Sequence, residues 1–182
     1  GGYYTFPGVV VDEDDPSDRI FGIRISLTRA ISAGDKIDIT LPSGWSQYPN
    51  STITSRLIKI PGGGASSVQV ENFLKGLKFH LASDKKMNGV VVLLIQDASD
   101  IDDMNRQVYY SSASDLWYEY VEGRKEWWEA YNLAQDRKFM GNKGNLATIP
   151  FFNDMSGELE NNFLSSILPS GKKAWLGGTR AD

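Results

Sequence analysis

The sequence contains no cysteine and only one histidine, His80. Without cysteine the chain has no disulfide, no thiolate zinc site and no cysteine nucleophile. This absence fits a cytosolic protein, and it equally fits a surface protein that is stabilised without disulfides. His80 lies on the face of a predicted strand opposite Phe79 and Leu81. We therefore expect an exposed strand histidine there, rather than a metal ligand or a catalytic base.

The chain also lacks an excess of basic residues and a long apolar run. Its 19 Lys and Arg are outnumbered by 23 Asp and Glu, which gives a formal net charge of −4. Nucleic-acid binders need basic residues to displace counterions from phosphates, so we expect no nucleic-acid partner. The longest aliphatic stretch, residues 89–95, is far shorter than the about 18 residues of a membrane-spanning helix. We predict no membrane span.

Alternating apolar and polar residues dominate the chain from residue 3 to about residue 110. Strands are predicted over residues 21–27, 37–41, 51–60, 77–81 and 90–95, with turn signals rich in Gly, Pro and Ser between them. Val70, Phe73, Leu74 and Leu77 follow helical spacing and predict one short helix. Several short strands with regular turns are typical of a β-sandwich, which we assign to residues 1–110.

The pattern changes after an acidic, polar stretch at residues 97–105, which together with residues 111–115 marks a domain boundary. Residues 111–182 have an α+β pattern that begins with an aromatic strand over 116–121. A helix is predicted over about 125–139, with a buried stripe of Trp127, Ala130, Tyr131 and Ala134. A second helix is predicted from about Ser156, with a buried face of Leu159, Phe163 and Ile167. The predicted fold class is mostly β with an α+β C-terminal part.

Four motifs of the C-terminal third resemble, in order and character, the first half of a C-type lectin-like domain. They are the Trp127, Ala130 and Ala134 spacing, the run 144–149, the run 160–164 and the run 174–178. Ala134 stands where animal members carry a cysteine, so the chain is similar to the cysteine-free bacterial branch found in large surface adhesins. Residues 150–157 are extra relative to the usual spacing, so the second helix is either shifted or preceded by an additional loop. Residues 73–79 and 90–97 loosely resemble an immunoglobulin-like or cadherin-like repeat, which precedes such domains in that branch.

The resemblance implies that a strand over residues 174–179 belongs to the middle of a complete domain. It also implies that the calcium and sugar ligands of the family lie in a second half that this chain lacks. We therefore expect a fragment that leaves Trp175 and Leu176 uncovered. The predicted partner is the missing half-domain or another chain segment that covers them, since contiguous apolar surface favours association.

Three sets of residues are candidates for binding. Calcium prefers oxygen ligands from several carboxylates in a short loop, although such a loop is often simply solvated. The candidate calcium ligands are Asp97, Asp100, Asp102 and Asp103. Glu160 resembles a helix glutamate that family members use for an accessory calcium or an internal salt bridge, and we expect it to be salt-bridged or solvated. Trp128 lies off the predicted buried stripe and could stack on a sugar ring, the alternative being a partly covered surface tryptophan.

We favour a binding protein without enzymatic activity. In this interpretation the chain is an extracellular segment of a bacterial adhesin, which recognises a glycan or a protein through the lectin-like domain while the β-sandwich serves as a spacer. One alternative is a purely structural stalk. The other is a fragment of a carbohydrate-active enzyme, for which no pair of carboxylates is singled out by its spacing.

Overall fold

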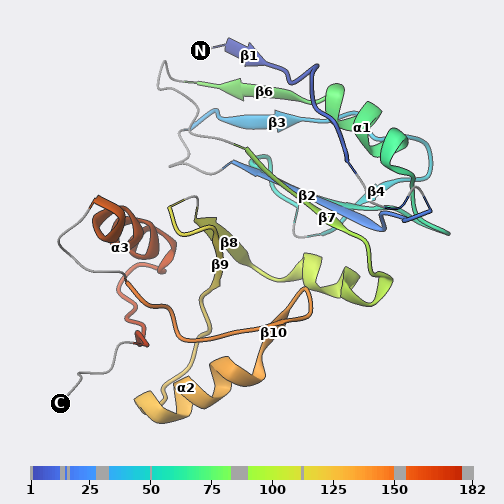
Figure 1. Ribbon diagram of the computed structural model, residues 1–182. Helices are drawn as coiled ribbons and strands as arrows, with labels where there is room; N and C mark the ends of the chain where they lie inside the picture. Colours follow the sequence, from blue (N-terminus) through green and yellow to red (C-terminus); the bar gives the residue numbers. More distant parts are fainter. Residues whose placement is uncertain are drawn as a thin grey trace. The chain divides into compact units, whose positions relative to one another are not determined.

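The computed structural model describes residues 2–12, 15, 17–27, 33–49, 51–82, 90–111, 113–149 and 155–177. The chain divides into two compact units, Gly1–Asn105 (unit 1) and Arg106–Asp182 (unit 2) (Figure 1). Within the described residues four antiparallel sheets predominate over three α-helices and one 3-10 helix. The fold is thus mixed with β-structure dominant, as predicted. No helix in this part of the chain is both long and apolar enough to cross a membrane.

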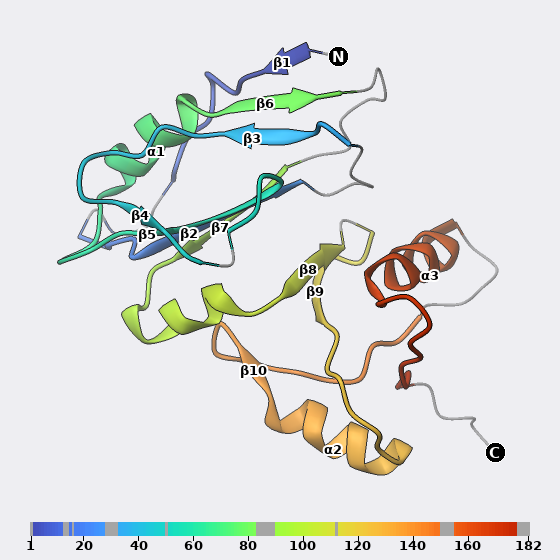
Figure 2. The ribbon, with the colours of Figure 1, turned by 180° about the vertical axis from the view of Figure 1, so that it is seen from behind.

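Unit 1 contains two sheets that lie in separate layers, with one α-helix beside them (Figures 1 and 2). The first sheet has the order β1 (Gly2–Tyr4), β6 (Lys78–Leu81), β3 (Lys36–Asp38). The second has the order β4 (Ser46–Gln47), β5 (Ser55–Lys59), β2 (Gly22–Leu27), β7 (Val90–Ile95). Each predicted strand overlaps one of these strands. β3 is shorter than the predicted strand 37–41, and β5 is shorter than the predicted strand 51–60. β7 lies at an edge, and β2 is its one neighbouring strand in the described residues.

One hydrophobic core joins the two sheets. Ile23 and Ile25 of β2 are fully buried, and so is Ile37 of β3. Phe79 and Leu81 of β6 are also buried, whereas His80 between them is only half-buried. The Nδ1 atom of His80 lies 3.0 Å from the carbonyl oxygen of Gly34. The predicted assignment of these three residues to opposite faces of one strand is confirmed.

The helix of unit 1 is α1 (Ser67–Lys75). The apolar residues Val70, Phe73 and Leu74, whose spacing predicted a helix, all pack into the core. The helix begins with a capping box. The Ser66 hydroxyl accepts a hydrogen bond from the Gln69 N–H, and the Gln69 side-chain oxygen accepts one from the Ser66 N–H at 3.0 Å. These bonds satisfy backbone donors that a helix start leaves without partners.

The acidic stretch predicted as the domain boundary belongs to unit 1. It forms the 3-10 helix η1 (Ala98–Asn105), which contacts β2, β5 and β7 and buries Met104. The Tyr48 hydroxyl donates a hydrogen bond to the Ile101 carbonyl at 3.1 Å and so attaches η1 to the chain after β4. The division between the units falls after Asn105, whereas a boundary between residues 110 and 111 would cut through β8 (Val108–Ser111).

Unit 2 begins with the hairpin of β8 and β9 (Leu116–Glu119), followed by α2 (Trp127–Asp136). A second, short hairpin joins β10 (Lys138–Phe139) to β11 (Asn142–Lys143), and α3 (Met155–Ile167) follows. Gly144, just after β11, lies against the end of α2. Its N–H donates to the Arg137 carbonyl at 2.8 Å, and an added Cβ would lie 2.7 Å from the Ala134 carbonyl oxygen. Only glycine permits this close approach.

Three details of unit 2 differ from the sequence-based expectation. Leu159 was predicted to be buried but is 56 % exposed, because α3 turns Glu160 inward instead. No residue of the α2 stripe is fully buried, and Tyr131 is 37 % exposed. Residues 174–177 form no strand, while residues 178–179 of that predicted strand lie outside the described part of the chain. The same holds for residues 150–154 of the predicted additional loop.

Candidate functional site

The start of α2 and the segment around Trp175 together form an aromatic surface on unit 2. Two indole hydrogen bonds connect them. The Trp127 N–H donates to the Leu176 carbonyl at 2.8 Å, and the Trp175 N–H donates to the Lys125 carbonyl at 2.8 Å. Both bonds bridge about fifty positions of sequence, so the chain 175–176 lies along the beginning of α2. Each indole is thus bonded to a segment that is distant in sequence.

A neighbouring segment holds the chain around Trp175 in place. The Gly177 N–H donates to the Ala147 carbonyl at 2.9 Å. An added Cβ on Gly177 would lie 2.9 Å from the Leu146 carbonyl oxygen, so the two backbones are in direct contact there. Glycine at 177 therefore allows the Trp175 segment to lie against residues 146–148.

We define the aromatic surface as Trp127, Trp128, Tyr131, Trp175 and Leu176. The rings of Trp127 and Tyr131 stack with a centroid distance of 5.3 Å and an interplanar angle of 17°. Trp128 is 61 % exposed and Trp175 is 51 % exposed. The expected exposure of Trp175 and Leu176 is thus observed, and Trp128 lies on the outside of α2. The exposure of Tyr131 was missed because helical spacing alone places it on the apolar stripe.

Glu160 of α3 is fully buried, and its carboxylate is held by hydroxyl groups. The Ser111 hydroxyl donates to Oε2 at 2.7 Å, and the Ser114 hydroxyl donates to Oε1 at 3.0 Å. Tyr118 also hydrogen-bonds to Glu160, and its burial together with this bond raises the pKa of the Tyr118 phenol to about 12. The expectation of a solvated or salt-bridged Glu160 is wrong, because Glu160 is buried and the hydroxyls of Ser111 and Ser114 are its partners in the described structure.

Glu119 of β9 connects three parts of unit 2. Its carboxylate accepts from Arg106 Nη2 at 2.5 Å and from Arg106 Nε at 3.3 Å, and from Arg137 Nε at 3.0 Å. Arg106 precedes β8 and also donates to the Lys138 carbonyl, and its guanidinium lies over the Phe139 ring. Burial raises the pKa of Glu119, but the two guanidinium groups lower it by more, so the pKa lies below its ordinary value.

The Glu119 cluster predicts how the stability of unit 2 depends on pH. The pKa is lower in the folded than in the unfolded chain, so the stabilisation is complete above the ordinary glutamate pKa of about 4.3 and is lost as pH falls below it. We expect Glu119→Gln to lower the urea midpoint of unit 2 at pH 7 and to flatten its decline between pH 5 and pH 3. Glu122→Gln, at an exposed ion pair with Lys172, is the control and should change neither. An unchanged pH profile in Glu119→Gln would contradict this assignment.

The four predicted calcium ligands lie in and just before η1. Asp97 is engaged locally, because its Oδ1 accepts from the Ser99 N–H and the Ser99 hydroxyl, both at 2.8 Å. These bonds lower the pKa of Asp97. Asp100, Asp102 and Asp103 are part of η1. In the described ranges no three His, Cys, Asp or Glu side chains are grouped so that they could hold a metal ion. The structure does not bring the four carboxylates together, and calcium binding here stays a prediction.

Comparison of the chain with protein-family models, with curated proteins and with solved structures finds no significant match.

Proposed function

We propose that this chain is an extracellular binding module of a bacterial surface adhesin. Unit 1 is an immunoglobulin-like or cadherin-like β-sandwich that acts as a spacer, and unit 2 is the first half of a C-type lectin-like domain. The two antiparallel sheets of unit 1 with their common core support the first assignment. The order of β9, α2 and α3 in unit 2 supports the second. Unit 2 recognises a glycan or a surface protein.

The aromatic surface of unit 2 is the observation that carries this proposal. Two tryptophans of this surface, Trp128 and Trp175, have half or more of their surface in water. Exposed apolar patches on soluble domains often mark interaction sites. The indole bonds of Trp127 and Trp175 hold two of the rings in place, so little side-chain entropy is lost when a ligand contacts them. Flat aromatic faces suit the C–H faces of sugar rings as well as apolar protein side chains.

Trp128→Ala tests the role of this surface in binding. We expect the wild-type chain to bind members of a glycan array and the variant to lose binding at least tenfold, about 1.4 kcal/mol. Stability should change little, because Trp128 is mostly exposed. Leu133→Ala is the matched control: Leu133 is an exposed apolar residue of the same helix outside the aromatic surface. Equal binding by Trp128→Ala and wild type would remove Trp128 from the site, and a wild-type chain silent towards both glycans and surface proteins would favour a structural stalk.

A further inference from the structure

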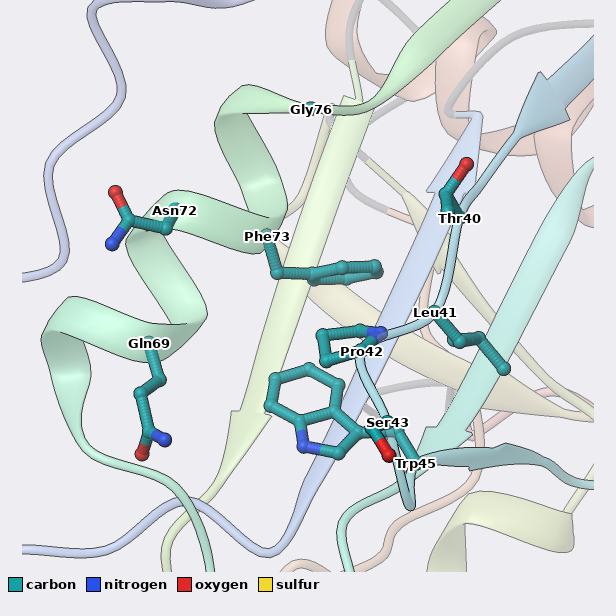
Figure 3. A pocket seen from close by; sticks show the side chains of 9 residues that line it. All are labelled: Thr40, Leu41, Pro42, Ser43, Trp45, Gln69, Asn72, Phe73 and Gly76. Carbon is teal, nitrogen blue, oxygen red and sulfur yellow. The ribbon is translucent and has the colours of Figure 1, made fainter.

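A pocket of about 490 Å³ lies in unit 1, between α1 and the turn that follows β3 (Figure 3). Its volume falls in the range of about 300–1,000 Å³ that is typical of small-molecule sites. Gln69, Asn72, Phe73 and Gly76 line it on the helix side, and Thr40, Leu41, Pro42, Ser43 and Trp45 line it on the turn side. The two groups come from segments about thirty residues apart in sequence.

Both walls of this pocket are held by the fold. The Trp45 N–H donates to the Pro42 carbonyl at 3.1 Å, and Gly44 has a φ of +83°, which closes the turn that presents Trp45. The rings of Trp45 and Phe73 lie 5.2 Å apart and are tilted by 56°. Phe73 is itself part of the core. The rings of Trp45 and Phe73 therefore form an aromatic floor that is present without a ligand.

The polar groups around this floor have hydrogen-bonding capacity to spare. In the part of the chain that the structure describes, no hydrogen bond is formed by the hydroxyls of Thr40 and Ser43, the Trp45 indole N–H or the Asn72 amide. Gln69 uses its side-chain oxygen in the capping box, which leaves its NH₂ group for other partners. None of the nine lining residues is charged. Donors and acceptors thus surround aromatic rings without any fixed charge.

We propose that this pocket binds one unit of a neutral saccharide. A charged ligand would find no counter-charge here, and a wholly apolar ligand would cover the hydroxyl, amide and indole groups without giving them partners. A neutral sugar ring offers an apolar C–H face to Trp45 and Phe73 and hydroxyls to the surrounding donors and acceptors. The site lies on unit 1, which the proposed function treats as a spacer. It would make unit 1 a second carbohydrate contact of the protein.

NMR titration of the full 182-residue chain tests this assignment. The probes are cellotriose, mannotriose and triacetylchitotriose, with a charged sialyl trisaccharide and an octaproline peptide for comparison. We expect at least one neutral probe to shift the Trp45 indole and Asn72 amide signals with saturation at millimolar concentration. The absence of such shifts with all three neutral sugars overturns the proposal. Stronger shifts with the charged sugar or with octaproline overturn the assigned ligand class.

Two arginine variants on α1 separate the pocket from the rest of the helix. Asn72→Arg places a long cation at the pocket and should weaken the neutral probe at least tenfold. Val68→Arg adds the same charge to the same helix at a residue that is 64 % exposed and outside the pocket lining, and it should bind like wild type. Both positions are exposed, so the fold tolerates them, which far-UV circular dichroism checks. Trp45→Phe keeps a ring against Phe73 but removes the indole donor, and should also weaken binding.

The same titration with Trp128→Ala distinguishes this site from the surface on unit 2. The Trp45 shifts should be unchanged in that variant. If Trp128→Ala abolishes the Trp45 shifts while Asn72→Arg leaves them intact, the pocket is not the binding site and the proposal fails. Loss of array binding in Trp128→Ala with intact Trp45 shifts would support two separate sites.

Discussion

Replacing Phe79 with alanine is expected to lower the free energy of unfolding of unit 1 by about 3–5 kcal/mol. Phe79 is 1 % exposed and belongs to β6, the middle strand of the three-stranded sheet. Its ring also packs edge-on against the ring of Phe6, with 5.2 Å between the ring centroids. Truncation removes the transfer free energy of the ring and leaves a cavity that the strands on both sides cannot close.

Urea unfolding followed through Trp45 measures this effect, since Trp45 is the one tryptophan of unit 1 among the five in the sequence. Labelling with 5-fluorotryptophan gives it a ¹⁹F signal of its own, separate from the four of unit 2. Val68→Ala, at an exposed position, is the control and should stay within about 0.5 kcal/mol of wild type. A loss below about 1 kcal/mol in Phe79→Ala would contradict the assignment of Phe79 to the centre of the core.

The second large effect is expected at Glu160. Glu160→Ala removes the acceptor of the buried Ser111 hydroxyl and of the half-buried Ser114 hydroxyl. Each buried polar group left without a partner costs about 1–3 kcal/mol. We expect unit 2 to lose most of its stability, with the loss seen as a lower urea midpoint for the ¹⁹F signal of Trp117. Glu160→Gln keeps the size of the side chain and one acceptor oxygen, so it should lose less.

Leu159→Ala, at the residue before Glu160, is the control for that prediction. Leu→Ala is usually among the costly substitutions, but Leu159 is mostly exposed on α3. Leu159→Ala should therefore cost less than Glu160→Ala, which reverses the order expected from hydrophobicity. If Leu159→Ala proves the more damaging of the two, α3 presents a different face to the β8–β9 hairpin than the one described here.

The elements of unit 1 could be predicted well because their signals are local. Alternation defines β2 and β6, and a short aliphatic run defines β7. Helical spacing and a capping box define α1, and both patterns lie within ten consecutive residues. The 3-10 helix η1 escaped notice because its acidic composition resembles a solvated loop. Its attachment depends on Met104 and on the distant Tyr48.

The features missed in unit 2 depend on partners far along the chain. The inward face of α3 is set by hydroxyls of Ser111 and Ser114, nearly fifty residues earlier, so spacing within the helix favoured Leu159 over Glu160. Trp128 could be singled out because it falls off the apolar stripe. The hydrogen bonds that place Trp127 against the Trp175 segment could not be predicted, because indole-to-carbonyl bonds leave no pattern in the sequence. The pocket beside α1 was missed because its two sides come from segments about thirty residues apart in sequence.

The edge position of β7 bears on the solubility of the protein. Its sequence, Val90 to Ile95, consists of six aliphatic residues without a charge, a proline or a glycine. Natural edge strands usually carry a charged residue, a proline or a bulge, which discourages backbone pairing with another molecule. A strand of this composition is a template for intermolecular β-pairing and for cross-β assembly. Among the strands that the structure describes, β7 is therefore the edge most prone to pair with a second copy of the chain in concentrated or partly unfolded protein.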